Sequence, residues 1–163
     1  VLVGSGNPEE GELRPQLMDR FGLSVDVLSS TDIDERIEVI KRRDAYENDH
    51  EAFIAHWQTE DATLRARIVA ARAALANLQT PDSALRRVAE LCIALGSDGL
   101  RGELTLLKAA RAFAAFAGDV AVTDDHIRKT AVLALRHRLR RDPLDDSGSS
   151  SRVARTVSEI LGD

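Results

Sequence analysis

The chain has 163 residues, of which 44% are hydrophobic and 4% aromatic, and a formal net charge of −5. This length is sufficient for one domain with a hydrophobic core, and no apolar run approaches the roughly 18 residues of a membrane span. The negative charge and the few aromatics argue against a nucleic-acid partner, and the single cysteine, Cys92, permits neither an internal disulfide nor a cysteine-based zinc site.

The first 29 residues predict the end of an α/β layer. Residues 1–3 are apolar and indicate the end of a buried strand, and residues 23–27 alternate apolar with polar side chains, as a strand with one buried face does. A short helix is expected between them, at residues 12–20. Two strands do not form a stable sheet alone, and the chain begins with Val1 and not with Met. We therefore expect a fragment that completes its sheet with strands from elsewhere.

From residue 31 onward the hydrophobic spacing predicts helices only. Residues 29–31 offer N-cap hydroxyls to the first of them, and Gly118 and Thr123 are the expected C′ and N-cap residues of two later ones. Leu104 and Leu107 are expected on a buried face. The predicted helices cover residues 32–47, 53–57, 64–78, 81–95, 100–117, 124–140 and 153–161, with a flexible connection at 147–151.

Three polar residues stand where ligands often bind. Asn7 follows the predicted strand end, where open α/β sheets bind ligands, although on its own an Asn there is more often a turn residue. Arg20 ends the short helix, which is also an ordinary place for a surface charge. Arg101 opens a predicted helix, where the helix dipole disfavours a cation unless an anion lies in front of it. Pairing with Asp98 or Glu103 is the alternative for Arg101.

The other polar features favour no second site. Residues 136–141 (RHRLRR) form a basic run that could bind phosphate or RNA, but a helix C-terminus favours cations in any case. The histidines lack metal-ligand spacing, so we expect no metal site. Cys92 falls on an apolar helical face and is expected in the core.

Four stretches of the sequence resemble one family. They are residues 2–17 (LVGSGNPEEGELRPQL), 19–25 (DRFGLSV), 96–107 (GSDGLRGELTLL) and 137–144 (HRLRRDPL). They are similar to the AAA+ ATPase (I) subunits of magnesium chelatase, nearly end to end but over the second half of that family's chain only. The resemblance implies a mainly α chain in which residues 1–29 are the C-terminal edge of an AAA+ α/β nucleotide-binding core, 30–80 are linker helices and 81–163 are a helical lid domain.

The resemblance also implies roles for the polar residues. Asn7 would be the sensor 1 residue, which orients the attacking water near the γ-phosphate. Arg20 would be an arginine finger that reaches into the nucleotide site of the neighbouring subunit, with Asp19 supporting it and Arg14 as a weaker alternative finger. Arg101 would be the sensor 2 arginine of the lid, which binds ATP at its γ-phosphate.

The implied activity of the intact protein is that of an ATP-dependent magnesium chelatase. It would couple ATP hydrolysis to Mg²⁺ insertion into protoporphyrin IX in chlorophyll or bacteriochlorophyll biosynthesis, in a bacterial cytoplasm or a plastid stroma. The implied assembly is a homo-oligomeric ring, expected to be a hexamer, with a D subunit and a porphyrin-binding H subunit as partners. ATP and Mg²⁺ would be bound mainly upstream, because the sequence contains neither a phosphate-loop motif nor an apolar run ending in Asp-Glu. The chain alone is therefore expected to be inactive.

Two alternatives remain open from the sequence. A MoxR-like chaperone or an MCM-like helicase would share the AAA+ core, and the net negative charge weighs against the helicase. A non-enzymatic helical interaction module would leave the three arginines as ordinary surface charges.

Overall fold

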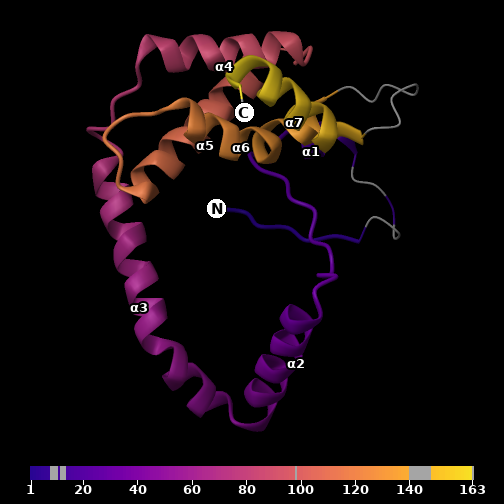
Figure 1. Ribbon diagram of the computed structural model, residues 1–163, viewed down its shortest axis with the longest axis vertical. Coiled ribbons are helices and arrows are strands. Elements are labelled where there is room, and N and C mark those ends of the chain that lie inside the picture. The colour runs from indigo at the N-terminus through magenta and orange to yellow at the C-terminus, as the bar shows by residue number, and fades with distance from the viewer. Residues whose placement is uncertain (8–10, 12–13, 98, 140–147, 163) are drawn as a thin grey trace.

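The structure, a computed structural model, describes residues 1–7, 11, 14–97, 99–139 and 148–162 (Figure 1). Its elements are α1 (Pro15–Met18), α2 (Ile33–Asn48), α3 (His50–Ala74), α4 (Asp82–Ala94), α5 (Arg101–Ala117), α6 (Asp124–Leu135), the 3₁₀ helix η2 (Arg136–Arg138) and α7 (Gly148–Leu161). Apart from an isolated parallel bridge between Gln79 and Ala121, the described residues contain no β-structure. The prediction of a mainly α chain is therefore confirmed. None of these described helices is long and apolar enough to cross a membrane.

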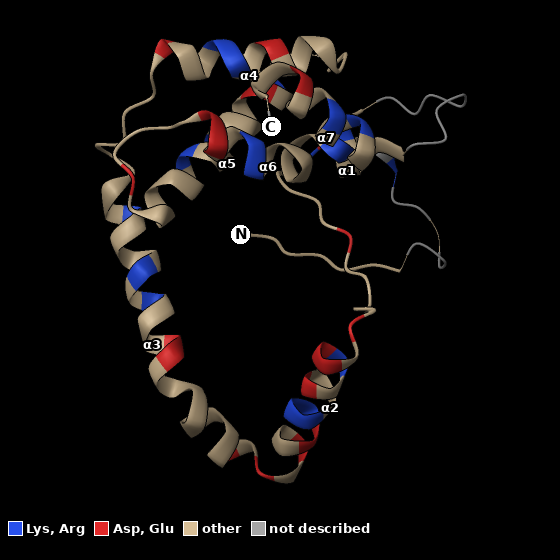
Figure 2. Cartoon of the chain, viewed as in Figure 1, with Lys and Arg blue, Asp and Glu red and all other residues tan. Residues whose placement is uncertain are grey.

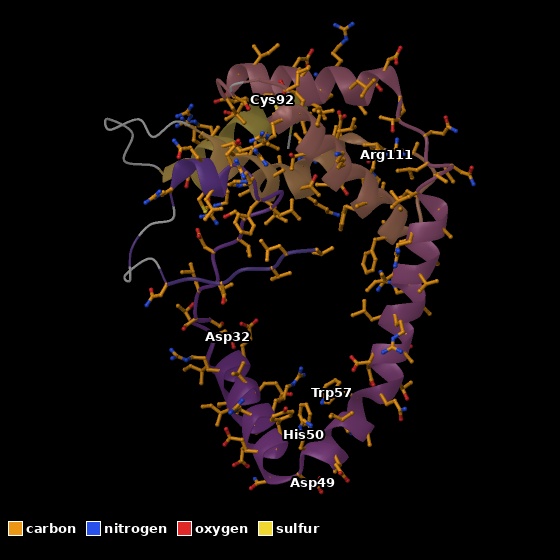
Figure 3. All side chains as sticks on the ribbon, turned by 180° about the vertical axis from the view of Figure 1, so that it is seen from behind. Asp32, Asp49, His50, Trp57, Cys92 and Arg111 are labelled. Atoms are coloured by element: carbon orange, nitrogen blue, oxygen red, sulfur yellow. The ribbon has the colours of Figure 1, made fainter. Side chains whose placement is uncertain are left out.

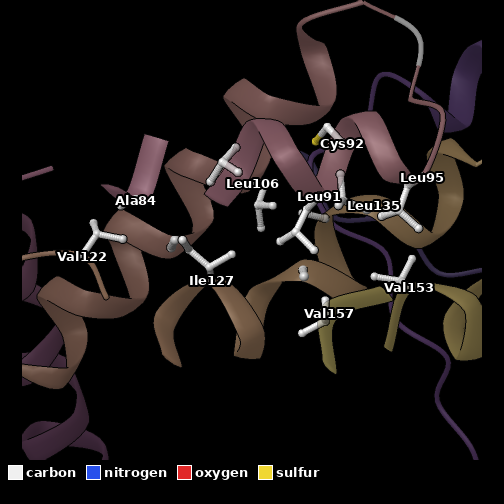
Figure 4. Close-up of a cluster of buried hydrophobic side chains, with 14 of the residues drawn as sticks. Ala84, Leu91, Cys92, Leu95, Leu106, Val122, Ile127, Leu135, Val153 and Val157 are labelled. Atoms are coloured by element: carbon white, nitrogen blue, oxygen red, sulfur yellow. The ribbon is translucent and has the colours of Figure 1, made fainter. Parts of the chain in front are cut away.

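Helices α4 to α7 form a bundle around a shared hydrophobic core (Figure 4). Helix α5 packs against α4 and α6, and the end of α3 also packs on α5. Arg111 of α5 fixes the connection between α3 and α4, because its guanidinium donates to the Thr80 hydroxyl at 2.7 Å and to the Leu75 carbonyl at 3.1 Å. The largest fully buried side chains are Leu91, Leu95, Leu106, Ile127, Leu135, Val153 and Cys92.

The face of α5 that enters the core is only partly the predicted one. Leu106, Ala110 and Ala114 are fully buried at intervals of four residues, which confirms the small-residue face. Leu104, predicted on the buried face, is 54% exposed. Because successive helical residues are rotated by about 100°, Leu104 lies roughly on the opposite side of the helix from Leu106. The spacing of leucines alone does not distinguish these two positions.

The ends of α5 and α6 follow the local signals in the sequence. Gly118 ends α5 in the left-handed region with φ 88°, and Thr123 is the N-cap of α6. His126 completes the cap: the Thr123 backbone N–H donates to Nδ1 at 3.0 Å, and Nε2 contacts the Asp119 carboxylate at 2.9 Å. Helix α6 ends at Leu135 and is followed directly by η2. The α-helix therefore stops before its predicted end at residue 140, which lies outside the described residues.

Helices α2 and α3 form an arm that extends away from the bundle (Figure 1). Asp49 joins them: its N–H donates to the Ala45 carbonyl at 3.0 Å, and its carboxylate accepts from the Ala52 N–H at 2.9 Å. The Arg42 guanidinium lies 4.5 Å from the ring centroid of Trp57, which links the two helices near this junction (Figure 3). Helix α2 buries no residue, and Ile33, Ile37 and Ile40 of its predicted apolar face are 73%, 43% and 68% exposed.

Several other helix boundaries differ from the predictions; the short helix expected at residues 12–20, for example, ends at Met18. The helices expected at 53–57 and 64–78 merge into one helix, α3, because no Gly or Pro interrupts residues 50–74, and α3 ends at Ala74, before the predicted end at residue 78. Asp32, and not residues 29–31, caps α2 by accepting a hydrogen bond from the Glu35 N–H at 2.9 Å. Residues 148–151 are helical and not a flexible connection; residue 147 lies outside the described residues.

The two predicted strands are absent from the described residues. Residues 1–7 and 23–32 have no regular secondary structure, and Val3 and Val25 are 87% and 66% exposed. A strand is defined by hydrogen bonds to a neighbouring strand, and the described chain offers these segments no such neighbour. The alternation of apolar side chains alone therefore does not produce a sheet here.

Candidate functional site

Residues 19–26, called the docked segment below, follow α1 and attach the N-terminal part of the chain to the bundle. The backbone N–H groups of Arg20 and Phe21 donate to carbonyls of α1 at 3.0 Å, which makes a tight turn after that helix. Further along, the Ser24 N–H donates to the Leu133 carbonyl of α6 at 2.9 Å. The docked segment thus runs beside the end of α6.

Arg101, the first residue of α5, forms an ion pair with the carboxylate of Asp19 in the docked segment. The two side chains are 59% and 41% exposed. The carboxylate supplies the negative charge that the start of a helix favours and offsets the unfavourable cation there. Glu103, one expected alternative, does not pair with Arg101 among the described residues, and Asp98, the other, lies outside them. The anion in front of α5 is therefore a carboxylate of the same chain.

Arg138, at the end of η2, is the second partner of Asp19. One guanidinium nitrogen donates to the Asp19 carboxylate at 2.5 Å and to its carbonyl at 2.9 Å, and the other donates to the Phe21 carbonyl at 2.8 Å. The side chain is only 4% exposed. Charge-assisted hydrogen bonds to several acceptors hold a guanidinium in one orientation. Arg138 is thus fixed more firmly than the exposed Arg101.

The basic run binds the docked segment at two further points. Arg136 forms an ion pair with Asp26, and His137 Nε2 contacts the Phe21 carbonyl at 3.0 Å. Basic positions gather beside α1 where these elements meet (Figure 2). The described part of the run therefore pairs with acceptors of its own chain. Arg138 donates to the Ala134 carbonyl at the end of α6, as a helix C-terminus favours, and the run also binds the docked segment. Residues 140–141 lie outside the described residues.

The protonation of His137 follows from its surroundings. Burial lowers the pKa of this imidazole below its ordinary value, because the half-buried ring loses the water that stabilises the charged form, while the hydrogen bond to Phe21 acts in the opposite direction. A lowered pKa leaves the ring neutral near pH 7. The proton then stays on Nε2, where it is donated to the Phe21 carbonyl.

Of the predicted site residues, the structure brings Arg101 and Asp19 into contact and places Arg20 beside them. The Arg20 side chain is exposed and forms no ion pair with an acid among the described residues. Arg14 is exposed at the start of α1, and its carbonyl accepts from the Leu17 N–H at 2.8 Å. Asn7 is exposed in the separate irregular segment 1–7. The catalytic roles of these residues remain predictions.

Sequence reasoning missed Arg138, which contacts both neighbours of Arg20. The basic run and the two acids Asp19 and Asp26 carry complementary charge, which is the one signal that could have suggested the contact. No group of three or more His, Cys, Asp or Glu in the described part of the chain could hold a metal ion. The ion pairs at this site join Arg101 and Arg138 to the Asp19 carboxylate.

Comparison with known proteins identifies the relatives of this chain. Residues 85–159 match the AAA lid domain family. The chain is 66% identical over 161 residues to the magnesium-chelatase 38 kDa subunit of Cereibacter sphaeroides, which covers 99% of this chain and 48% of that protein. It is 42% identical over 162 residues to magnesium-chelatase subunit ChlI of Synechocystis sp., and this match covers 99% of this chain and 45% of that protein. The chain thus spans about half the length of these curated relatives.

A solved structure from Cytophaga hutchinsonii shares the fold, with a TM-score of 0.66 at 17% sequence identity, covering 91% of this chain and 48% of that one. At this identity the likeness concerns the fold alone. The relatives and the lid-domain match confirm the resemblance to the AAA+ subunit of magnesium chelatase and the helical lid that the sequence predicted.

Proposed function

We propose that this chain is the lid-containing part of the AAA+ ATPase subunit of a magnesium chelatase. The observation that carries the proposal is its 66% identity over 161 residues to a magnesium-chelatase 38 kDa subunit. In the proposed function the intact subunit hydrolyses ATP, and this drives Mg²⁺ insertion into protoporphyrin IX during chlorophyll or bacteriochlorophyll biosynthesis.

Arg20 is the proposed arginine finger. Phosphoryl transfer develops negative charge on the transferred group, and a guanidinium held at the right place stabilises it. An exposed arginine can reach a neighbouring subunit, and Arg20 is exposed while the residues on both sides of it are anchored. Asp19 supports the finger through these anchors, and Arg14 is the weaker alternative.

Arg101 is the proposed sensor 2 residue and would hold the terminal phosphate of ATP. Its surroundings fit an anion: it lies at the start of α5, it is 59% exposed, and its present partner is a carboxylate. A phosphate could replace that exposed carboxylate without leaving a buried charge unpaired, because Asp19 would keep its contact with Arg138. Asn7 is the proposed sensor 1 residue. ATP and Mg²⁺ are otherwise bound by parts of the subunit outside this chain.

The proposed assembly is a homo-oligomeric ring, because a finger acts only if a neighbouring subunit presents its nucleotide. The proposed ring is a hexamer. The proposed partners are the D subunit and a porphyrin-binding H subunit, in the cytoplasm of a bacterium or the stroma of a plastid. Residues 1–29, 30–80 and 81–163 are the proposed core edge, linker and lid. These assignments rest on the family resemblance.

Reconstitution of the chelatase tests the proposal. The full-length subunit is combined with D and H subunits of a related chelatase, ATP, Mg²⁺ and protoporphyrin IX, and magnesium protoporphyrin is measured by its fluorescence. The proposal predicts product that depends on ATP and on the added subunit. ATP hydrolysis without product, while the related 38 kDa subunit gives product under the same conditions, would indicate a MoxR-like or MCM-like ring ATPase instead.

A further inference from the structure

Arg138 makes more hydrogen bonds to the docked segment than any other described residue. All three of its guanidinium nitrogens are used: Nε donates to the Ala134 carbonyl at 3.1 Å, one terminal nitrogen binds Asp19, and the other binds the Phe21 carbonyl at 2.8 Å and the Thr105 hydroxyl at 3.4 Å. With 4% of its side chain exposed, Arg138 is shielded from competing water.

These contacts hold the backbone on both sides of Arg20. In the docked segment, the carbonyls that accept from Arg138 belong to Asp19 and Phe21, the residues directly before and after Arg20. Fixing two carbonyls on either side of a residue restricts the φ and ψ angles between them, and so restricts where its side chain can extend. His137 adds a second hydrogen bond to the Phe21 carbonyl at 3.0 Å. The backbone at Arg20 is thus held by the bundle, while its side chain is left exposed.

We propose that Arg138 is a positioning residue for Arg20, and that through it the end of the lid bundle sets the position of the finger. This inference rests on the proposed role of Arg20. A finger is effective only at a defined place, since a displacement of about 1 Å at a reacting group can cost about 10²-fold in rate. Arg138 joins α5, α6 and the docked segment, so a shift of these lid helices displaces the finger with them.

The chemistry at this position requires an arginine. A planar guanidinium presents donors in a fixed fork that reaches a carboxylate and two backbone carbonyls at the same time. A lysine ammonium keeps the positive charge but concentrates its donors on one nitrogen. Arg138→Lys should therefore pair with Asp19 and release the Phe21 carbonyl, which separates the effect of charge from the effect of geometry.

The experiment measures ATP hydrolysis by rings of the full-length subunit carrying Arg138→Gln or Arg138→Lys. Arg87→Gln is the control for the loss of an arginine ion pair, because Arg87 pairs with Glu90 and Asp124 on the bundle and does not contact the docked segment. We expect kcat to fall about 10-fold to 100-fold in both Arg138 variants, with KM for ATP changed less than about 3-fold. We expect the Arg87 control to retain its activity.

Mixing subunits separates positioning from a folding defect. An Arg138→Gln subunit still has its own nucleotide site, and a subunit whose nucleotide site has been inactivated still has its finger. Rings that contain both should regain activity, because some sites then combine a good nucleotide site with a good finger. A mutation that only unfolds the lid would give no such recovery. Hydrogen exchange of the Ser24 amide, which is bonded to Leu133, should rise in Arg138→Gln and stay unchanged in Arg87→Gln.

Arg20→Ala rings, measured alongside, distinguish the two levels of the proposal. Loss of activity in Arg20→Ala with unchanged activity in both Arg138 variants would overturn the positioning role alone. The positioning role would also be overturned by a second result. In it, subunits with an inactivated nucleotide site restore ATP hydrolysis to Arg20→Ala rings but not to rings of the Arg138 variants. Unchanged activity in Arg20→Ala would overturn the proposed finger and this inference with it.

Discussion

Asp19 and Arg101 are 82 positions apart in the sequence and form an ion pair at the start of α5. The same carboxylate also binds Arg138, so one acid is shared by an exposed and a buried guanidinium. An exposed ion pair contributes little to stability because water and salt compete with it, whereas breaking a buried pair leaves an uncompensated charge. Asp19 therefore connects Arg101, which is proposed to bind the nucleotide, with Arg138, which anchors both neighbours of Arg20.

Removing the charge of Asp19 should destabilise the bundle. Asp19→Asn leaves the nearly buried Arg138 without its carboxylate, and we expect the free energy of unfolding to fall by about 1–2 kcal/mol, a range that allows for the 41% exposure of Asp19. The measurement is urea unfolding followed by circular dichroism. Glu90→Gln, which removes a carboxylate from the exposed pair with Arg87, is the control and should change the midpoint much less. Equal shifts in both variants would contradict the special place of Asp19.

The anchoring of the docked segment should weaken in acid. Burial lowers the pKa of His137 in the folded state, so the unfolded chain takes up its proton first, near pH 6.5. The stability contributed by the neutral ring is therefore complete above about pH 6.5 and is lost as the pH falls from there toward the folded pKa. A protonated ring would also face Arg136 and Arg138, and Asp19 would offset part of that charge.

This pH dependence is measured as a difference between variants. Urea unfolding of the unmodified chain should lose more stability between pH 7.5 and pH 5.5 than that of His137→Gln, whose amide can still donate to the Phe21 carbonyl but does not titrate. His56→Gln, at an exposed position of α3, serves as the control and should follow the unmodified chain. Parallel pH profiles for all three proteins would show that His137 is not the titrating group.

The thiol of Cys92 should be unreactive in the folded chain. Burial raises its pKa to about 12, with the nearby Glu103 carboxylate adding to the shift, and the residue is fully buried. We expect a thiol reagent at pH 8 to label the native protein at least about 100-fold more slowly than the urea-unfolded protein. Rapid labelling without denaturant would mean that the core around α4 opens far more often than its packing indicates.

The choice between the two faces of α5 is tested by two leucines. Leu106→Ala removes a fully buried side chain and should lower the free energy of unfolding by about 2–5 kcal/mol. Leu104→Ala, on the same helix but 54% exposed, should lower it by less than about 1 kcal/mol. Urea midpoints measured in one buffer compare them directly. A larger effect of Leu104→Ala would place the core on the face that the sequence predicted.

Local features of the fold were predictable because their causes are local. Gly118 and Thr123 mark helix ends through the backbone geometry and the capping group that each residue type provides. The prediction of a strand at residues 23–27 was wrong, because a strand depends on a neighbouring strand that the described chain does not supply.

The site shows the same division between local and distant causes. The unfavourable position of Arg101 at a helix start correctly indicated a nearby anion, and the family resemblance suggested ATP. The anion found in the structure is Asp19, far away in the sequence. Arg138 gave no separate signal, since a cation near a helix end is favourable without any partner. Its contacts with both neighbours of Arg20 become visible only when the chain is folded.

The central claim, that Arg20 acts in the nucleotide site of the next subunit, is tested most directly by mixing subunits. Full-length Arg20→Ala subunits are added to unmodified ones at increasing fractions, with Arg14→Ala as the alternative finger and Arg65→Ala, an exposed residue of α3, as the control. Rings of Arg20→Ala alone should lose at least about 10²-fold in ATP hydrolysis, and in mixtures the rate should fall as their fraction rises, because each such subunit leaves the nucleotide site of one neighbour without its finger. A rate that stays unchanged at every fraction of Arg20→Ala, or one that responds to Arg14→Ala instead, would contradict the account.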